Sequence, residues 1–377
     1  MTSKTSPHVL ILGAGIGGLT LAQSLRKKGI SYEIFERDRG DHVRPEGWAI
    51  GIHTMVDDLR ASFPDDLSPV EGLSHLRALN LPAELAFYVP PEYPKYNKRV
   101  ARIEENEDSV TAHFSDGTSA TGDILVGAEG PHSPTRRHIF PEHDPLQTES
   151  LLIISCDVVL DKHEMEHELS LGHSGYVVQF DDADGMHSTI FVGLNEIAPD
   201  GKSGKYFFHM MQRYPGADKD DFWTFKATGQ ELLDEARRKM KDLPSRFKLI
   251  VDKSSAEGVR VPPIRMYCLL LDSLPVSRIT LLGDAAHAMT THRGEGGAQA
   301  MQDSLNLARA IAAIDLNDEQ GWKKTIGDYQ REMLARGSNA ARLSHGAFDV
   351  ETLRGERGAP YIWGHPAGPL PEETVTL

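Results

Sequence analysis

Three glycines and one glutamate near the amino terminus have the types and spacing to bind phosphate and ribose groups. Gly13, Gly15 and Gly18 follow an apolar run over 9–12, and Glu36 comes after a second run that ends at residue 35. In this pattern the first glycine permits a tight turn, the second lets a pyrophosphate approach the backbone, and the third lets helix and strand pack closely. The free N–H groups that begin the helix attract phosphate, and an acid roughly 20 residues further on can accept a ribose hydroxyl. The stretch therefore predicts an adenine dinucleotide, which could be NAD(P) or FAD.

Two more acids follow buried runs later in the chain and could face the same ligand. Glu129 ends one apolar run and Asp284 ends another, each beside a glycine. Ligands of a doubly wound sheet bind at the carboxyl ends of its strands, so both acids should lie near the dinucleotide. A glycine turn over 293–297 then precedes a predicted helix over 298–314, whose amino-terminal dipole can stabilise negative charge.

One short motif offers a competing chemistry. His163, Glu164 and His167 match the pattern H-E-x-x-H, which on a helix could chelate zinc with the glutamate as base. The segment follows a strand and is short, and five-residue matches arise by chance. We therefore expect a solvated acidic turn there and no metal site in the protein. His287 is expected to pack or to bond to backbone.

The length and patterning of the chain predict two domains that are interleaved in sequence. In this chain of 377 residues, 1–150 and 267–345 should form one discontinuous α/β domain that binds the dinucleotide. A mainly antiparallel sheet over 151–266 should form a substrate domain, and 346–377 a carboxyl-terminal tail. Within the sheet domain we expect a strand over 151–160, a hairpin of 176–180 and 188–194, helices over 205–213 and 229–241, and a strand over 247–251.

Composition excludes several partners. The net charge of −15 argues against binding to nucleic acid or to anionic membranes, both of which require clustered basic surface. No run approaches the roughly 18 apolar residues of a membrane span. Cys156 and Cys268 have no paired spacing, which suits a reducing compartment. We expect a cytoplasmic monomer or homodimer that acts on a small molecule.

Three separated stretches together resemble one family. They are residues 13–36, the segment LVGAEGPHSPTR at 125–136 and the segment LLGDAAHAMTTHRGEGGAQAMQDS at 281–304. Their order is similar to that of single-component FAD-dependent flavoprotein monooxygenases of the para-hydroxybenzoate hydroxylase type, and closest to fungal members that act on secondary metabolites. The resemblance implies the FAD-binding Rossmann-like fold of that type (GR2) with an interleaved antiparallel substrate domain.

The same resemblance implies a cofactor and a reaction. FAD would be the bound cofactor, NAD(P)H the co-substrate, and O2 the source of an oxygen atom that hydroxylates or epoxidises a small apolar or aromatic metabolite. His292 and Arg293 lie on a loop that should face flavin and substrate, where the histidine could act as acid or base or could simply be exposed. The residues that the resemblance places along FAD are Gly13, Gly15, Gly18, Glu36, Arg44, Ala49, Asp284 and Gly297.

Four departures from the family pattern leave other functions open. Glu129 stands where an aspartate is usual, Thr291 where a proline is usual, and Ala298 where an asparagine is usual. The segment before Arg99 is short and lacks the usual arginine that grips FAD. These changes lie around the reactive end of the cofactor. A non-redox isomerase or cyclase that uses the same cavity is therefore one alternative, and a catalytically silent binding protein is another.

Overall fold

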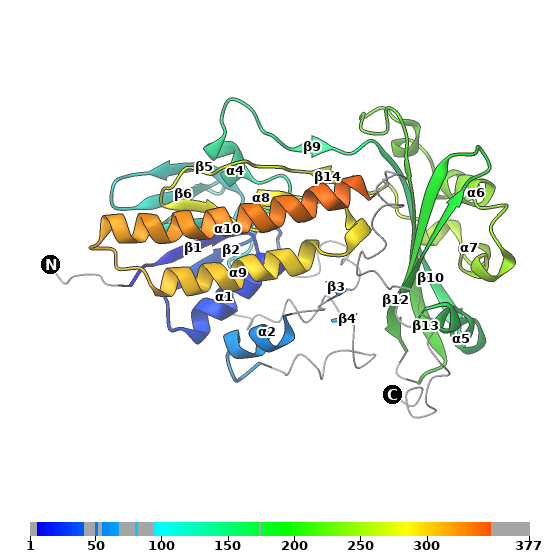
Figure 1. Ribbon diagram of the computed structural model, residues 1–377, viewed down its shortest axis with the longest axis horizontal. Coiled ribbons are helices and arrows are strands. Elements are labelled where there is room, and N and C mark those ends of the chain that lie inside the picture. Colours follow the sequence, from blue (N-terminus) through cyan, green and yellow to red (C-terminus); the bar gives the residue numbers. More distant parts are fainter. Residues whose placement is uncertain are drawn as a thin grey trace. The chain divides into compact units, whose positions relative to one another are not determined.

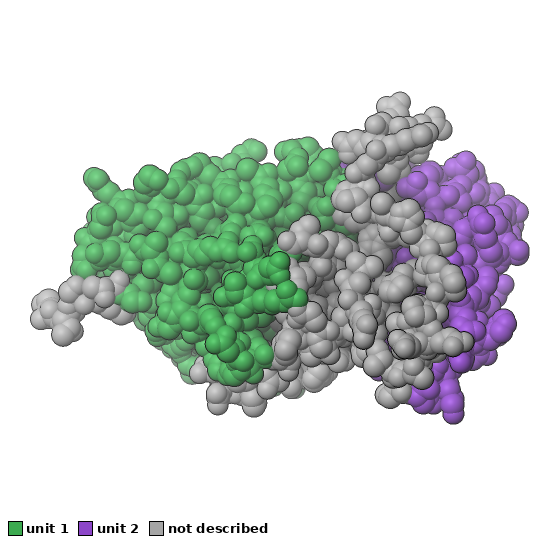
Figure 2. All heavy atoms as spheres, turned by 60° about the horizontal axis from the view of Figure 1, so that its bottom comes forward, with its two compact units in different colours: residues 1–73, 83–147, 267–345 green, residues 74–82, 148–266, 346–377 purple. Residues whose placement is uncertain are grey.

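The computed structural model describes residues 6–40, 50–51, 55–67, 80–81, 94–172, 175–198 and 200–347. The described residues form two compact units (Figure 2). Unit 1 comprises those within 1–73, 83–147 and 267–345, and unit 2 those within 74–82, 148–266 and 346–377. Among the described helices, none is long and apolar enough to cross a membrane.

Unit 1 is built on a four-stranded parallel sheet (Figure 1). Its order is β15-β8-β1-β2, formed by Ile279–Leu281, Ile124–Gly127, Val9–Leu12 and Tyr32–Phe35. The strands are short and apolar because both of their faces are covered, as parallel sheets require. The buried patterns of three of these strands are continuous rather than alternating.

Helices cover one face of this sheet and an antiparallel sheet covers the other. Odd-numbered side chains of β1, such as Val9 and Ile11, pack with the long helices α1 (Ile16–Lys27), α9 (Gly296–Ala312) and α10 (Glu319–Gly346). Even-numbered ones, Leu10 and Leu12, pack on the other sheet. That second sheet has the order β5-β6-β7, formed by Val100–Glu105, Val110–Phe114 and Ser119–Gly122.

Short elements connect these layers. In unit 1 they include the helices α2 (Val56–Ser62), α4 (Pro134–Ile139) and α8 (Asp284–His287) and the 3-10 turn η5 (Thr291–Arg293). The remaining two-residue strands are β3 (Ile50–Gly51), β4 (Asn80–Leu81), β9 (Gln147–Thr148) and β14 (Tyr267–Cys268).

Unit 2 is a four-stranded antiparallel sheet with helices on one face. Its order is β10-β13-β12-β11, formed by Leu151–Asp161, Ser203–Arg213, His187–Ile197 and Gly175–Asp181. Even-numbered side chains of the strands pack on the helices in one core. The helical pieces are α5 (Lys162–Leu171), η2 (Trp223–Phe225), α6 (Gly229–Lys239), η3 (Ser245–Phe247), α7 (Leu249–Asp252) and η4 (Ala256–Gly258).

Three sequence predictions in unit 2 are wrong. Residues 205–213, expected as a helix, belong to strand β13, and residues 247–251, expected as a strand, fall in η3 and α7. Both faces of β13 are buried, so its apolar run lacks the alternation that marks a strand. The expected acidic turn at 163–167 is instead part of helix α5, which begins with a capping box between Asp161 and Glu164.

Candidate cofactor site

In the first glycine turn of unit 1, two of the three glycines are tightly packed and the third has open space beside it. Gly13 has φ of +102°, and a Cβ atom there would lie 2.3 Å from the carbonyl oxygen of Ala128. A Cβ atom on Gly18 would lie 2.0 Å from the carbonyl oxygen of Gly13. A Cβ atom on Gly15 would have no neighbour within 4 Å. Two glycines therefore hold strand and helix together, and the third leaves space for a ligand.

Helix α1 begins at this open position without a capping side chain. Gly15 is its N-cap residue, no side chain bonds to its first amides, and its first turn holds no acid. The first N–H groups of a helix need partners, and phosphate oxygens suit them in both hydrogen bonding and charge. The amino terminus of α1 thus has the geometry of a phosphate cradle.

Glu36 lies beside the same turn. One of its carboxylate oxygens accepts the Ala14 N–H at 2.9 Å and the other accepts the Asp38 N–H at 3.0 Å. The acid that the sequence placed at the end of β2 is therefore held against the glycine turn, where a ribose would follow the pyrophosphate. Arg44 and Ala49, the other residues expected along this end of the cofactor, lie outside the described residues.

Asp284 begins helix α8 at the end of β15. Gly283, with φ of +58°, makes the turn that delivers it. The Asp284 side chain makes no hydrogen bond to another described residue. Burial raises the pKa of Asp284, His287 lowers it and the Asp303 carboxylate raises it further. A half-buried carboxylate in this state is suited to accept hydrogen bonds from a ligand's hydroxyl groups.

The amino terminus of α9 lies next to Asp284. A Cβ atom on Gly296 would lie 4.0 Å from Asp284 Oδ1. Gly296 and Gly297 open this helix of 17 residues, whose N-cap residue Glu295 makes no side-chain cap bond and whose first turn holds no acid. The structure thus places Asp284 beside the end of α9 that Gly296 and Gly297 open. An uncapped helix terminus beside a carboxylate fits a ligand that combines hydroxyl groups with a ring carrying negative charge.

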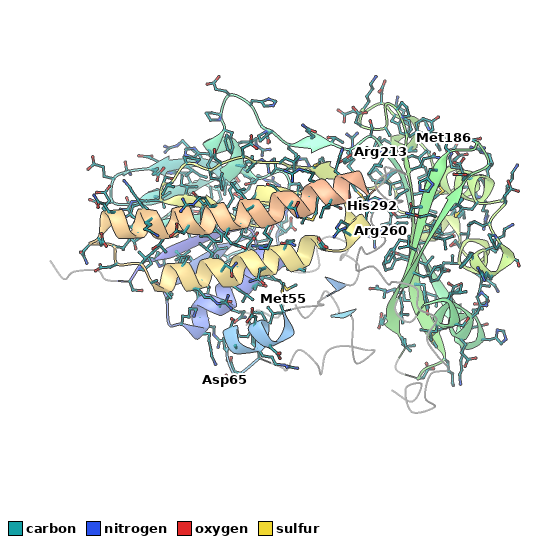
Figure 3. The ribbon with its side chains drawn as sticks, in the orientation of Figure 1. Met55, Asp65, Met186, Arg213, Arg260 and His292 are labelled. Atoms are coloured by element: carbon teal, nitrogen blue, oxygen red, sulfur yellow. The ribbon has the colours of Figure 1, made fainter. Side chains whose placement is uncertain are left out.

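The predicted catalytic residues lie on the turn that leads into α9. His292 and Arg293 belong to the 3-10 turn η5, which ends at Gly294 with φ of +58° (Figure 3). Arg293 Nη2 donates to Glu295 Oε1 at 3.0 Å, so the guanidinium is held along the loop. His292 is half-buried.

Hydrogen bonds join the three sequence motifs directly. The Ala128 N–H donates to the Leu12 carbonyl at 2.7 Å, which links the second motif to the residue just before the first. Arg136, whose side chain is fully buried, donates from Nη1 to the Ala285 carbonyl at 3.2 Å, which links the second motif to the third. Ser304 Oγ donates to the Gly17 carbonyl at 2.8 Å, which links the third motif to the first.

Sequence reasoning missed the residues that make these links, Arg136 and Ser304, together with Asp303. The available signal was weak, because residues 303 and 304 are two of several polar residues in the predicted helix.

Comparisons with known proteins decide the family. The FAD binding domain family matches residues 93–344, and the NAD(P)-binding Rossmann-like domain family matches residues 11–41. The FAD-dependent monooxygenase thnD of Trichoderma harzianum is 38% identical over 387 residues, covering 93% of this chain and 95% of the relative. The chain belongs to the FAD-dependent monooxygenases. The FAD-dependent monooxygenase dbaB of Emericella nidulans is 29% identical and covers 84% of this chain and 89% of that relative.

Solved structures show that this monooxygenase has the fold the sequence predicted. A putative FAD-containing monooxygenase from Photorhabdus luminescens has a TM-score of 0.75 at 21% identity, with 93% of this chain and 100% of that chain covered. The 2,6-dihydroxypyridine-3-hydroxylase of Arthrobacter nicotinovorans has a TM-score of 0.69 at 17% identity, with 99% and 97% covered. The FAD-binding Rossmann-like fold with antiparallel sheets is therefore confirmed.

The monooxygenase accommodates its unusual Glu129 by using it as a helix cap. The Glu129 carboxylate accepts the Ser133 hydroxyl at 2.6 Å and the Thr135 N–H at 3.3 Å, at the start of α4. Burial raises the pKa of Glu129, and these bonds oppose that rise. Of the other departures, Thr291 begins η5 and Ala298 is the third residue of α9. The short segment before Arg99 lies in part outside the described residues.

Two residues of the H-E-x-x-H segment, His167 and Glu164, have structural partners. His167 Nε2 bonds to the Arg246 carbonyl at 2.8 Å. Glu164 closes the capping box of α5 and pairs with Lys253. The motif is thus used to build and dock a helix in unit 2. Its residues are not arranged as a metal-binding set.

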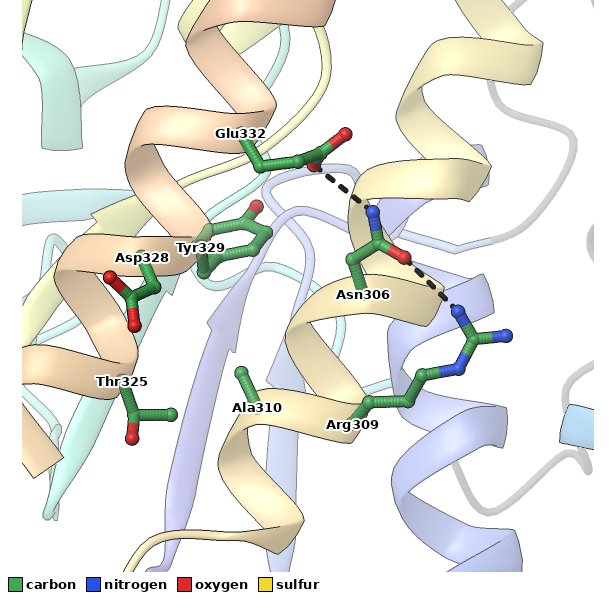
Figure 4. A pocket seen from close by; sticks show the side chains of 7 residues that line it. All are labelled: Asn306, Arg309, Ala310, Thr325, Asp328, Tyr329 and Glu332. Carbon is green, nitrogen blue, oxygen red and sulfur yellow. Dashed lines mark hydrogen bonds between the residues drawn. The ribbon is translucent and has the colours of Figure 1, made fainter. Parts of the chain in front are cut away.

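One groove on unit 1 is separate from the cofactor motifs (Figure 4). It lies between α9 and α10 and has a volume of about 310 Å³. Asn306 bridges it by donating to Glu332 at 3.0 Å and accepting from Arg309 at 3.1 Å. These bonds engage both polar atoms of the Asn306 side chain within the groove. The region around Asp284 is therefore the better candidate for the functional site. Its lining residues are Asn306, Arg309, Ala310, Thr325, Asp328, Tyr329 and Glu332.

Proposed function

We propose that this monooxygenase uses NAD(P)H and O2 to hydroxylate or epoxidise a small apolar or aromatic metabolite, in secondary metabolism. Relatives named as FAD-dependent monooxygenases come from fungi such as Trichoderma harzianum and Talaromyces islandicus. Another relative, from Klebsiella oxytoca, is named as an FAD-dependent urate hydroxylase. Cys156 and Cys268 are buried and form no disulfide, which supports a reducing cytoplasm as the place of action.

The proposed binding mode of FAD follows the residues of unit 1. The amides at Gly15 would hold the pyrophosphate, Glu36 the adenosine ribose, and Asp284 the ribityl hydroxyls. The amino terminus of α9 at Gly297 would stabilise negative charge on the flavin ring. Bound FAD supplies electron transfer and oxygen activation, and the protein supplies position and exclusion of water. The observation that carries this proposal is the Asp284 carboxylate, half-buried and next to an uncapped helix terminus.

The proposed substrate wall is the face of the unit 2 sheet opposite its helices. Phe207 on this face lies 5.5 Å from Phe191 and 5.0 Å from His209, measured between ring centroids. His209 Nδ1 is 2.7 Å from Ser155 Oγ. Burial, aided by the charge of Arg260, lowers the pKa of His209 to about 3, so this imidazole is neutral near pH 7. Aromatic rings beside a neutral hydrogen-bonding pair suit an aromatic or phenolic compound.

Replacing Asp284 by alanine should weaken FAD binding about 10- to 100-fold, the equivalent of losing hydrogen bonds to a charged acceptor. Asp284→Asn, which keeps an acceptor oxygen but loses the charge, should have an FAD affinity between those of the wild type and Asp284→Ala. Titration of the flavin-free protein with FAD, followed by flavin fluorescence, measures the affinity. Asp328→Ala on the exposed face of α10 is the control and should bind FAD as the wild type does. Equal affinities for Asp284→Ala and the control would refute the proposed binding mode.

The FAD-loaded protein should oxidise NAD(P)H and consume O2 when given its substrate. A panel of hydroxylated aromatic compounds, including 2,6-dihydroxypyridine and urate, would be screened with an oxygen electrode, and products would be analysed by mass spectrometry after isotopically labelled O2. We expect one labelled oxygen atom in the product and a rate that depends on NADH or NADPH. A compound converted to an isomer without NAD(P)H or O2 would instead support the non-redox isomerase or cyclase.

A further inference from the structure

A buried ion pair lies directly behind the turn that presents Asp284. His287 and Asp303 are both 0% exposed, and His287 Nε2 is 2.7 Å from Asp303 Oδ2. The other ring nitrogen of His287 has no hydrogen-bond partner among the described residues. Buried charged groups are costly unless they are paired, so a pair in this position calls for a role.

Asp303 connects three elements of unit 1. Besides His287 of α8, its Oδ2 accepts the Gly283 N–H at 2.8 Å, and its Oδ1 accepts Arg336 Nη2 of α10 at 2.8 Å. Arg336 is itself held by Glu332 at 2.7 Å. The N–H of Gly283 belongs to the residue with φ of +58° that turns the chain into Asp284. Asp303 therefore fixes the backbone from which Asp284 projects.

Helix α10 is shaped to accept the His287 ring. Gly337 lies in the interior of this helix of 28 residues, where glycine is a poor helix former and alanine is the best. A Cβ atom on Gly337 would lie 2.2 Å from His287 Cδ2. The helix thus lacks a side chain at the point where the ring packs against it.

Charges on all the packed elements face His287. Asp284 on its own helix and Asp303 on α9 are acidic, and Arg336 on α10 is basic. Burial lowers the pKa of His287, but the ion pair and hydrogen bond with Asp303, aided by Asp284, outweigh it and raise the pKa above its ordinary value. A protonated His287 therefore offsets the repulsion between the Asp284 and Asp303 carboxylates.

We propose that His287 is a positioning residue for FAD, which acts through Asp303 to hold the Gly283 turn and through its charge to offset the repulsion between the Asp303 and Asp284 carboxylates, so that Asp284 stays directed toward the ribityl chain. This inference rests on the proposed role of Asp284. A histidine whose pKa is raised in the folded protein carries its charge, and stabilises the groups around it, below its ordinary pKa near 6.5. This stabilisation is lost as pH rises through the raised value. FAD affinity should therefore fall on the alkaline side of neutrality.

The test compares FAD affinity at pH 6.5 and pH 9 in four full-length variants and the wild type. His287→Gln keeps a donor for Asp303 but cannot carry a charge. Gly337→Ala displaces the ring without changing any titratable group. Asp284→Ala removes the proposed ligand contact, and His138→Gln, at an exposed position on α4, is the matched control. Thermal unfolding and amide hydrogen exchange of the peptide spanning Gly283 are measured on the flavin-free proteins in parallel.

The wild type and His138→Gln should lose about tenfold in FAD affinity between the two pH values, because loss of the His287 charge weakens its bond to Asp303 and leaves the Asp303 and Asp284 carboxylates to repel each other. His287→Gln should change less than about twofold and match the weaker, alkaline affinity of the wild type. Gly337→Ala should weaken FAD binding at both pH values and speed exchange of the Gly283 amide, although alanine is the better helix former.

Two results would overturn the inference. One is a full pH dependence in His287→Gln, and the other is wild-type FAD binding and wild-type amide exchange in Gly337→Ala. If Asp284→Ala alone binds FAD normally, the proposed role of Asp284 is wrong. If it binds weakly while the other two variants behave as the wild type, only the positioning role of His287 is wrong.

Discussion

Replacing Gly15 by alanine is expected to abolish most FAD binding and leave the fold intact, whereas the same change at Gly18 is expected to destabilise the fold itself. A Cβ atom at Gly15 enters open space, and its backbone, with φ of −76° and ψ of −179°, is extended and accessible to any residue. The space it enters is where the pyrophosphate would approach the backbone. We expect the dissociation constant for FAD to rise about 100-fold.

Gly18 has the opposite environment. Its Cβ atom would lie 2.0 Å from the Gly13 carbonyl oxygen, a backbone atom that can move only if the strand and helix separate. Overpacking of this kind costs about 3 kcal/mol or more of unfolding free energy. Urea unfolding of the flavin-free protein measures this cost, and FAD titration measures the affinity of each variant.

The pair of glycine variants separates ligand binding from folding. Gly117→Ala serves as a control, because Gly117 lies outside the three motifs, in a turn between β6 and β7 with φ of +85° and open space around it. It should lose about 1 kcal/mol and keep full FAD affinity. A Gly15→Ala protein that binds FAD normally would show that the phosphates do not approach the backbone at this turn.

Local chemistry explains which parts of the site could be predicted from sequence. Gly13, Gly18 and Glu36 act through backbone geometry within one strand, one helix and the next strand, so their spacing alone indicates their role. Asp284 was predictable because it ends a buried strand, where ligands of parallel sheets bind.

Contacts between distant residues could not be predicted. Arg136 reaches Ala285, and Asp303 reaches Gly283 and Arg336, across separations that no single periodicity encodes. The errors in unit 2 have a related cause. The apolar run of β13 is buried on both faces, which removes the alternation that marks a strand. Helix α7 has only four residues, too few to show a helical period.

The bonds among the motifs also explain why they occur together. The Gly17 carbonyl accepts from Ser304, and the Gly283 amide donates to the neighbouring Asp303, so consecutive residues of α9 brace two of the glycine segments. The turn after β8 is braced by Arg136, which reaches the third motif. A change in one motif therefore disturbs the geometry of the others, even where the motif makes no contact with the cofactor.

In unit 2, the change Lys239→Met should lower the free energy of unfolding by about 3–5 kcal/mol. This is the cost of leaving a buried charge without its partner. Lys239 ends helix α6 and is 1% exposed, and its Nζ lies 2.7 Å from Asp182 Oδ2. Asp182 also accepts Gln212 Nε2 at 2.6 Å and the Met186 N–H at 2.9 Å, which fixes the β11–β12 hairpin against the helix. Chemical unfolding at pH 7 measures the loss.

The pH dependence of this loss distinguishes a buried charge from lost packing. Burial raises the pKa of Asp182, but the bond from Lys239 and its other donors outweigh burial and hold the pKa below its ordinary value. A carboxyl group whose pKa is lowered by folding stabilises the protein at pH values above its ordinary pKa near 3.9. This stabilisation is lost as pH falls through the lowered pKa. Without Lys239, burial should raise the pKa of Asp182, so protonation should relieve the variant. The penalty of Lys239→Met is therefore expected to shrink between pH 7 and pH 4.

The adjacent residue provides the control for the buried pair. Arg238 also pairs with Asp184, at 2.8 Å, but its side chain is 45% exposed. Arg238→Met should therefore change stability by less than about 1 kcal/mol, as exposed pairs do. The double variant Asp182→Asn with Lys239→Met should be more stable than the single Lys239→Met, because it leaves no buried charge. If instead the double variant is the less stable one and the penalty does not vary with pH, Lys239 acts through packing of its aliphatic chain and the ion pair contributes nothing.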